Sequence, residues 1–539
     1  MGFTKKIIAL ISIGALTSFL ASCATSSSSS SNNENRDSYV LAQHIEPDTN
    51  LIPSMAYEDG GGVVVDLLFE GLVRYDESGD SVLAVAQSIS SSDNGKTWDV
   101  KLKEGKKFSD GSPVTSASFV DAWNWAANPS NEARLIDFFA PIEGYDDEDK
   151  EHLSGLKIIS DTEFTITLSH NDTEFSQRLG YKAYYPVPSA SLASADTAKE
   201  QGEKPISNGP YILTSWDHDE QMILEPNPHY EGDKKPKNNG IIFKIYTDDA
   251  AAYNDLLANN LDVVYAIPSE AMNTFGKELG ERAINQKGAL WQSITIPYYL
   301  PHFSGDEGRL RRQALSMAID RGEICSQLFV GTRSPASDFV ADVIPGHSDS
   351  ISGNEVLSLN VEKAKELWKQ ADEISPWGDS TFEIAYNADS SAHKAWVEAV
   401  VNQLHNNLGI NAAPKVYAKF DQMREDVVNQ KLTSAVRTGW QADYPSAYNF
   451  IAPLYQKNGS SNDSMYENEE LETILSHVTS KIDASERQKE YDTAQAILMR
   501  DLPAIPLWNQ NSVGGYSEKV SHVHFNWQAL PIYTDIEKK

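Results

Sequence analysis

One stretch of the chain combines residues that could bind a positively charged group. Residues 437–450 read R-T-G-W-Q-A-D-Y-P-S-A-Y-N-F, and Asp443 stands between Trp440 and Tyr444. A carboxylate between aromatic rings loses water and attracts an ammonium strongly, because the ring faces also favour a cation. The same residues fit a simpler structure, in which the aromatics belong to the core and Asp443 makes a turn before Pro445. Spacing alone leaves both interpretations open.

The surrounding sequence predicts where this stretch lies in a fold. Residues 432–438 alternate enough to form a short strand, so Asp443 is expected just after a strand gives way to a loop. Gly439 supplies flexibility before the acid, and Pro445 supplies stiffness after it. A pocket that is formed before its ligand arrives needs this combination.

Both halves of the chain alternate strand and helix patterns, which predicts an α/β fold. Residues 241–267 show the pattern clearly, because a strand at 241–246, a helix at 250–257 and a strand at 263–267 follow one another. No segment repeats with a period of about 20 to 50 residues, which argues against a solenoid or a propeller. Further strands are predicted at 40–46, 98–102, 164–168, 382–386 and 411–416, and further helices within 56–75 (ending near Gly71), at 116–127, from Arg309, at 397–408 and over 471–482.

The N-terminal residues predict export and attachment to a membrane. Two lysines precede an apolar run that is too short for a permanent span, so residues 1–22 are expected to be a signal peptide. The sequence L-A-S-C that follows resembles a lipoprotein box, in which Cys23 carries the lipid, and two acyl chains suffice for stable anchoring. An ordinary cleaved signal with a chance cysteine is the alternative. Residues 23–38, rich in serine, would form a flexible tether.

Composition limits the partners of the remaining chain. With 539 residues, of which 40% are hydrophobic, the chain is long enough for several domains with ample cores. The net charge of -32 argues against nucleic acid as a partner and is compatible with cationic ligands. Beyond the signal no segment is apolar for long enough to cross a membrane. There are two cysteines, so Cys325 has no intramolecular partner once Cys23 is lipidated.

An enzyme is the alternative of a different class, and the motifs of common enzymes are missing. The sequence lacks G-x-S-x-G, H-E-x-x-H and C-x-x-C. Residues 95–97 read G-K-T, but Ser90 replaces the leading glycine of a phosphate loop and a strand follows instead of a helix. His522 and His524 would share one face of a predicted strand, where we interpret them as half-exposed residues and not as metal ligands. We therefore expect no enzymatic activity, no cofactor and no metal site.

Five short motifs, in this order, point to one family. The motifs are L-F-E-G-L at 68–72, F-S-D-G-S-P-V-T at 108–115, N-G-P-Y at 208–211, R-R-Q-A-L-S-M-A-I-D-R at 311–321 and G-W-Q-A-D-Y-P at 439–445. From about Tyr39 to near the C-terminus, their order and spacing resemble the oligopeptide- and dipeptide-binding lipoproteins of ABC importers, which are large extracellular solute-binding proteins.

The resemblance implies a two-lobed clamp, with a discontinuous first lobe and an extra inserted domain. A peptide would be enclosed between the lobes, its main chain paired with strands and its side chains in hydrated pockets. Hinge segments are expected near 291–298 and 503–508. The implied boundaries are 39–80 for the first part of lobe I, 81–205 for inserted domain II, 206–290 for the second part of lobe I, 291–505 for lobe II (domain III) and 506–539 for the C-terminal part of lobe I.

The resemblance also implies roles for individual residues. Asp443 matches the aspartate that binds the α-ammonium of the peptide, and Trp440 and Tyr444 match the aromatics of that motif. Arg437 and His393 match residues that help to neutralise the carboxylate end of the peptide in some members. Two departures put the rule for peptide length in doubt: the common D-Y-P-D-P becomes D-Y-P-S-A at 443–447, and Val428 replaces a basic residue.

The resemblance leaves the solute and the partners partly open. A non-peptide solute, such as an oligosaccharide or a metal chelate, is the main alternative on the same fold, and a surface adhesin is another. Asp443 favours a peptide, because a neutral sugar has no ammonium to pair with it. We expect a monomer that is lipid-anchored at the outer face of the cytoplasmic membrane and delivers its ligand to the permease subunits of an ABC transporter.

Overall fold

The computed structural model describes residues 36–147, 151–388 and 391–539. The chain divides into a short unit, residues 1–37, and a main unit, residues 38–539. The predicted signal peptide and Cys23 lie outside the described residues, so both stay predictions. Within the described ranges, no helix is long and apolar enough to cross a membrane.

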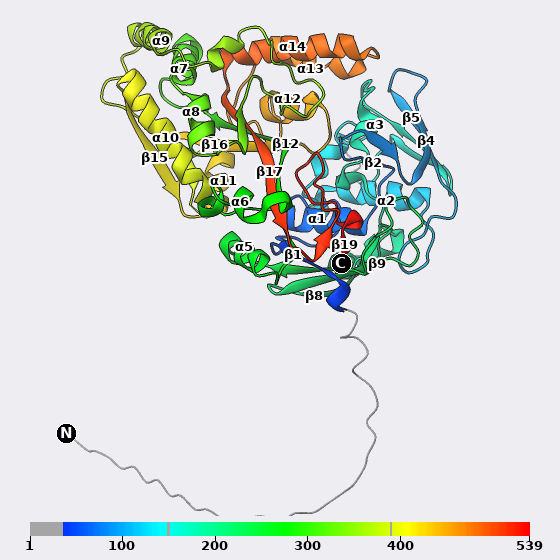
Figure 1. Cartoon of the computed structure of the whole chain (residues 1–539). Helices are drawn as coiled ribbons and strands as arrows, with labels where there is room; N and C mark the ends of the chain where they lie inside the picture. Colours follow the sequence, from blue (N-terminus) through cyan, green and yellow to red (C-terminus); the bar gives the residue numbers. More distant parts are fainter. Residues whose placement is uncertain (1–35, 148–150, 389–390) are drawn as a thin grey trace, which may run out of the picture. The chain divides into compact units, whose positions relative to one another are not determined.

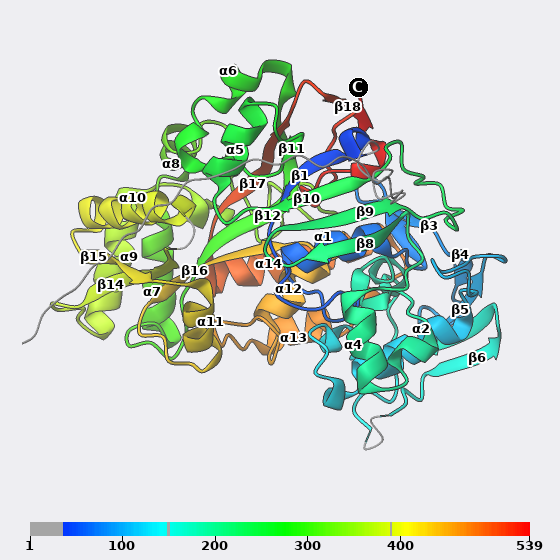
Figure 2. The same ribbon diagram turned by 90° about the horizontal axis from the view of Figure 1, so that it is seen from below.

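A large mixed sheet runs through the main unit (Figures 1 and 2). Among the described residues it has 11 strands in the order β15-β14-β16-β12-β17-β11-β1-β10-β9-β8, and β13 pairs with β17. Its strands are β1 (Val40–His44), β8 (Tyr211–Asp217), β9 (Gln221–Pro226), β10 (Ile241–Ile245), β11 (Val263–Val264), β12 (Ala283–Thr295), β13 (Arg333–Pro335), β14 (Thr381–Asn387), β15 (Asn411–Tyr417), β16 (Ala435–Gln441) and β17 (Ala504–Tyr516).

The two large hydrophobic cores among the described residues divide the main unit into two lobes. The first core gathers buried residues from 40–263 and 520–536, and the second gathers residues from 289–508 together with Trp527. The long antiparallel pair of β12 and β17 serves both lobes, because Ile284 packs against the first core whereas Ile294 lies in the second. The predicted α/β architecture is therefore present, with one sheet continuing from lobe to lobe.

The first lobe holds a second, smaller sheet and short helices. Figure 2 shows helix α1 alongside strand β8, with which it is in contact. The small sheet has the order β4-β5-β7-β6. The elements of this lobe are α1 (Asp59–Leu68), β2 (Val73–Tyr75), β3 (Ser81–Leu83), β4 (Ala86–Ser90), β5 (Thr97–Leu102), α2 (Ser116–Ala127), β6 (Leu156–Ser160), β7 (Glu163–Thr167), α3 (Phe175–Arg178), α4 (Ala195–Glu203), α5 (Asp249–Leu257), α6 (Phe275–Leu279), β18 (Val520–Ser521) and β19 (Glu537–Lys538).

The second lobe is richer in helices, as the sequence predicted beyond Arg309. Figure 1 places α10 beside strand β15, with α7 and α9 on the same side of the molecule, away from the small sheet of β4 and β5. The helices of this lobe are α7 (Gly305–Met317), α8 (Arg321–Gln327), α9 (Val361–Ile374), α10 (Ser391–Leu408), α11 (Phe420–Val428), α12 (Ala447–Tyr455), α13 (Glu469–Leu475) and α14 (Ala484–Asp501).

Two of the sequence motifs pack against each other and explain where α1 ends. The helix was predicted to end near Gly71, but Phe69 is already extended. The N–H of Gly209 donates to the carbonyl of Leu68 at 2.7 Å, and the side chain of Asn208 bonds both backbone groups of Glu70. A Cβ atom at Gly209 would lie 2.6 Å from the carbonyl carbon of Leu68, so only glycine permits this approach.

Four other predicted elements differ from the structure. The predicted strand at 432–438 is shifted to 435–441 as β16, and the strand at 263–267 is only two residues long as β11. The helix predicted over 471–482 is wrong beyond Leu475, because a 3-10 turn follows and Ile482 is 69% exposed. The strand through His522 and His524 is also wrong, because β18 ends at Ser521 and His522 has a φ of +57°. Among the described residues no group of three or more potential ligands could hold a metal ion.

Candidate functional site

Strand β16 has an open edge that leads to Asp443. On one side β16 pairs with β12 along Val436 to Gln441, but β14 pairs with it only at Ala435 and Val436. Residues 437–441 therefore have no partner strand on the β14 side among the described residues. Gly439, in the middle of this edge, is exposed. Such an edge offers backbone donors and acceptors to an added extended chain.

Asp443 lies two residues beyond β16 and is held by an asparagine. The N–H of Asp443 donates to Oδ1 of Asn449 at 2.9 Å, and Nδ2 of Asn449 donates to Oδ2 of Asp443 at 2.9 Å. Asn449 is buried at the start of α12, and it also accepts from Nε1 of Trp440 at 3.2 Å. One side chain therefore fixes both the acid and the neighbouring indole, as a pocket formed in advance requires.

The surroundings of Asp443 favour a positively charged ligand. Burial raises the pKa of its carboxyl, and hydrogen bonds from Asn449 and Tyr181 together with the charge of Lys182 oppose that rise only in part. The ionised carboxylate is thus under-compensated in the unliganded protein. An incoming ammonium would supply the missing charge.

The ammonium group of Lys182 interacts with several carboxylates. Its ammonium lies 3.8 Å from Asp66, whose pKa is raised by burial, and its charge also acts on Asp59 and Asp443. Three acids with raised pKa values share this single lysine, so the site keeps an excess of negative charge. That excess also favours a cation as the ligand.

Tyr444 faces the other lobe. Its ring is buried and lies 5.4 Å from the guanidinium carbon of Arg178, which is also 4.9 Å from the ring of Tyr448. Arg178 is held by Asp172 at 2.6 Å, and neither side chain is more than 8% exposed. Tyr444 thus joins the loop of Asp443 to the first lobe, a contact that the sequence did not suggest.

Arg437 and His393 belong to the second lobe, and Arg437 lies at the other end of the open edge. Nε of Arg437 donates to Oδ1 of Asn387 at 2.8 Å, and its guanidinium lies 5.0 Å from the ring of Phe420. His393 is buried near the start of α10 and accepts from Nε1 of Trp396 at 3.4 Å. Val428, in contrast, is 67% exposed at the end of α11.

The two lobes touch through the residues just before α3. The N–H of Thr173 donates to the carbonyl of Thr479 at 2.7 Å. Glu174 accepts from Ser446 at 3.2 Å and from the hydroxyl of Tyr491 at 2.5 Å, and Nε of Arg487 lies 3.3 Å from its other oxygen. Glu174 is only 7% exposed. In this structure the lobes are therefore in contact here, an arrangement that we call closed, and a buried acid lies at the contact.

Comparison with known families decides what kind of protein this is. A family model for bacterial extracellular solute-binding proteins, family 5 Middle, matches residues 81–462. The chain belongs to this family.

Relatives of this solute-binding protein extend over nearly its whole length. The oligopeptide-binding protein OppA of Bacillus subtilis is 26% identical over 530 residues, which cover 93% of each chain. The solved structure of the Escherichia coli murein tripeptide binding protein MppA has a TM-score of 0.78 at 22% identity and covers 93% of this chain and 98% of its own. Haemophilus influenzae OppA, solved in complex with RPPGFSPFR, has a TM-score of 0.76 at 22% identity, covering 93% and 99%. These likenesses confirm the two-lobed fold, and the relatives named are binding proteins.

The sequence of this solute-binding protein indicates Asp443 as a candidate, but it does not indicate the residues that surround Asp443 in the structure. Asn449 contacts Asp443 from six residues further along the chain, and this spacing was the available signal for the contact. Tyr181 and Lys182 come from a distant segment, G-Y-K-A-Y-Y, in which a lysine among aromatics was the available signal. Such contacts between distant segments follow from the tertiary fold and leave no spacing in the sequence.

The raised pKa of Asp443 predicts that Asp443→Asn stabilises the unliganded protein. The pKa of the Asp443 carboxyl is higher in the folded than in the unfolded protein. The contribution of this group to the free energy of unfolding is therefore fully present at acidic pH and is lost as the pH rises through the folded pKa. In Asp443→Asn, the side-chain carbonyl can still accept the hydrogen bond from Asn449. The variant has no carboxyl group at this position, so no stability is lost through its ionisation. We expect a higher Tm for Asp443→Asn at neutral pH, and a difference that shrinks as the pH falls through the raised pKa.

Thermal unfolding of both proteins at a series of pH values measures this effect. Asp121→Asn, a change at an exposed position of α2, controls for removal of one negative charge. Equal Tm values for the native protein and Asp443→Asn at neutral pH would contradict the prediction.

Proposed function

We propose that this protein captures peptides between its two lobes and delivers them to the permease of an ABC importer. The main support is the open edge of β16, because it joins an arginine at 437 to the under-compensated acid at 443. A peptide is complementary to this edge, because its main chain can pair with the strand and its N-terminal ammonium can pair with Asp443. The names of the relatives, which bind oligopeptides and murein peptides, agree with this proposal.

Both ends of the ligand have residues of opposite charge in this proposal. Asp443, flanked by Trp440 and Tyr444, takes the ammonium, and Arg437 with His393 neutralises the carboxylate. Asp443 lies six positions after Arg437 in the chain, a span of at most about 20 Å. A peptide of several residues is long enough to reach both ends of such a span.

The acid discriminates between a peptide and the alternatives. A neutral oligosaccharide leaves the desolvated carboxylate without a cation, which costs binding energy. Mass spectrometry of protein purified without denaturation tests the proposal directly, because a trapped ligand stays with the protein. Recovery of short peptides is the expected result, and recovery of a sugar or a metal chelate alone would overturn it. Pull-down of a host protein without any small ligand would instead favour an adhesin.

The proposal includes the division of the chain into lobes and domains. Lobe I comprises 39–80, 206–290 and 506–539, domain II comprises 81–205, and lobe II comprises 291–505. The hinge is proposed near 291–298 and 503–508, which are the second-core ends of the segments in which β12 and β17 pass between the cores, Ile284 to Ala289 and Trp508 to Tyr516. The protein acts as a monomer without catalytic activity, and its partners are the peptide and the permease subunits.

Attachment to the outer face of the cytoplasmic membrane through Cys23 gives a separate prediction. Cys23→Ser is expected to abolish lipid labelling and to leave precursor or release soluble protein, because serine offers no thiol to acylate. Metabolic labelling with a fatty acid, followed by cell fractionation, measures both effects. Cys325→Ser is the matched control, since it removes the other cysteine and should leave labelling intact. Undiminished labelling of Cys23→Ser would exclude the anchor.

A further inference from the structure

The first lobe places several acids where its parallel strands end. Strands β10 and β11 both run parallel to β1, so the carboxyl ends of the three strands lie along one edge of the large sheet. Helix α1 follows β1, with Glu58 as its N-cap and Asp59 as its first residue. Helix α5 follows β10 and begins with Asp249, and Tyr265 comes directly after β11. These four side chains therefore belong to a single edge of the sheet.

Two neighbouring residues of β1 hold the starts of the two helices on opposite faces of the sheet. Nε2 of His44 donates to the carbonyl oxygen of Gly60 in α1 at 2.9 Å. Nε2 of Gln43 donates to Oδ1 of Asp249 in α5 at 2.7 Å. Successive side chains of a strand point to opposite faces, so α1 and α5 leave the edge in opposite directions. The crevice outside such a point is where ligands bind to open α/β sheets.

The acids at this edge line a recess. Asp59 and Asp249 are exposed to solvent, yet burial raises the pKa of each carboxyl. Side chains that solvent reaches although protein surrounds them lie on a concave surface. Burial also raises the pKa of the Tyr265 hydroxyl, and the charges of these two acids and of Glu58 raise it further. The three acids therefore converge on this phenol, and we call the four side chains the acidic recess.

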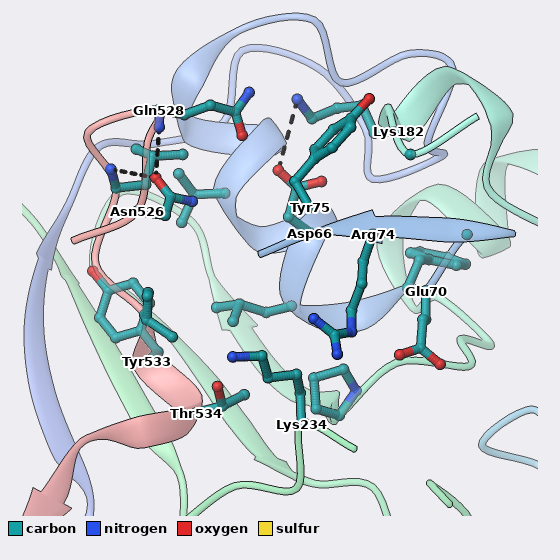
Figure 3. Close-up of a pocket in the computed structure, with 18 of the residues that line it drawn as sticks. Asp66, Glu70, Arg74, Tyr75, Lys182, Lys234, Asn526, Gln528, Tyr533 and Thr534 are labelled. Carbon is teal, nitrogen blue, oxygen red and sulfur yellow. Dashed lines mark hydrogen bonds and ion pairs between the residues drawn. The ribbon is translucent and has the colours of Figure 1, made fainter. Parts of the chain in front are cut away.

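Little positive charge compensates the acidic recess. The charged side chains that act most on Glu58 and Asp249 are other acids, namely Asp48, Asp59, Asp248 and Glu270. Lys182 acts on Asp59, but its ammonium is paired with Asp66 at 3.8 Å, as Figure 3 shows. The carboxylate of Asp59 itself has neither an ion pair nor a hydrogen bond among the described residues. A cation that enters the recess therefore meets carboxylates that the protein leaves largely unneutralised.

A buried amide beside Asp249 also lacks a hydrogen-bond donor. Gln43 is 1% exposed, and its Oε1 has no partner in the described part of the chain, although its Nε2 is bonded to Asp249. Buried polar atoms are normally hydrogen-bonded. An unpaired acceptor next to an acid calls for an N–H donor, and a cationic group of a ligand carries several such donors.

The acidic recess lies near enough to Asp443 to share a ligand with it. Lys182 acts on the carboxyls of both Asp59 and Asp443. A Cβ atom at Gly62, three residues after Asp59, would lie 3.1 Å from Cε of Lys182, so the lysine follows the face of α1 that Asp59 begins. An extended peptide advances about 3.3 Å per residue, and a lysine ammonium stands on a long, flexible stem. A basic side chain near the N-terminus of a peptide held by Asp443 can therefore enter the recess.

We propose that the acidic recess selects peptides with lysine or arginine near their N-terminus. This inference rests on the proposed peptide function and names the class of peptide. The α-ammonium of the ligand binds to Asp443 on the second lobe, whereas its side-chain cation binds to the carboxylates of the recess on the first lobe. The N–H donors of that cation satisfy the recess and the amide of Gln43. A basic peptide thus connects the two lobes through two separate charges.

Calorimetry with matched tetrapeptides tests this proposal. Lysine is placed in turn at the first, second and third positions of tetra-alanine, and norleucine, which is uncharged, replaces it in the comparison set. At one of these positions the native protein is expected to bind the lysine peptide about tenfold more tightly or better, as charge-assisted hydrogen bonds allow. Asp59→Asn should lower this ratio about threefold or more, and Asp59→Asn combined with Asp249→Asn should bring it to about one. The ratio compares two ligands of one protein, so a general effect of the variants on folding cancels.

Asp121→Asn is the matched control, because it removes one charge at an exposed position of α2 and should keep the native ratio. A ratio near one at all three positions, with norleucine peptides still bound, would overturn the inference and leave the peptide function intact. A preference for lysine that persists in the double variant would belong to the overall negative charge of the protein and would equally overturn it. If no peptide of either set bound, the proposed function would fail and the inference with it.

Discussion

Asp443→Ala is expected to weaken the binding of free peptides by roughly a hundred- to several-thousand-fold. The reason is that removing one partner of a buried charge pair costs about 3–5 kcal/mol, because the other charge is left desolvated. Asp443→Asn should lose almost as much, since the amide keeps the shape and the contact with Asn449 but not the charge. Calorimetry with a defined peptide measures the native protein and both variants.

The ligand offers a control that does not alter the protein. N-acetylated peptides have no ammonium, so they should bind the native protein poorly and should show little further loss with Asp443→Asn. Asp121→Asn, which changes the net charge equally at an exposed site, should bind free peptides like the native protein. If acetylated and free peptides bound equally well, Asp443 would be only a turn residue.

The sequence was sufficient for the elements that local patterns encode. Alternation and helical spacing predicted β5 and β7 to within one residue and α2 with its observed ends. The place of Asp443 just after a strand was also predicted, although β16 begins three residues later than expected. The error arose because apolar Leu432 was assigned to the strand, whereas it packs against the helix α11 residues Met423 and Val427 in a small separate core.

The residues that surround Asp443 could not be predicted from the sequence. Tyr181 and Lys182 reach Asp443 from more than 250 residues away in the chain, and no local rule brings them there. The same is true of Glu174, which Ser446 and Tyr491 enclose from the other lobe. Pairing of this kind depends on how the lobes close, so the composition of the site follows from tertiary structure although its central acid follows from a motif.

The contact at Glu174 leads to the second prediction, which concerns closure. In the closed arrangement Glu174 accepts from Ser446 and Tyr491 and pairs with Arg487, all of which belong to the second lobe. Truncating one partner of a buried, hydrogen-bonded charge pair at an interface costs about 2–5 kcal/mol. The lower value corresponds to about a thirtyfold shift of the equilibrium between open and closed forms. For a ligand that binds only the closed form, the apparent Kd equals the intrinsic Kd divided by the fraction of protein that is closed. A smaller closed fraction therefore weakens the apparent binding.

Glu174→Ala is therefore expected to increase the radius of gyration of the unliganded protein and to weaken peptide binding about tenfold or more. At saturating peptide its scattering curve should return to that of the native protein, because the ligand supplies the free energy that the lost contact no longer provides. Small-angle scattering with and without peptide, together with calorimetry, measures both effects. Glu163→Gln, which breaks a half-exposed ion pair with Lys101 in the same lobe, is the control and should change neither. Native scattering and native affinity in Glu174→Ala would show that the contact accompanies closure without stabilising it.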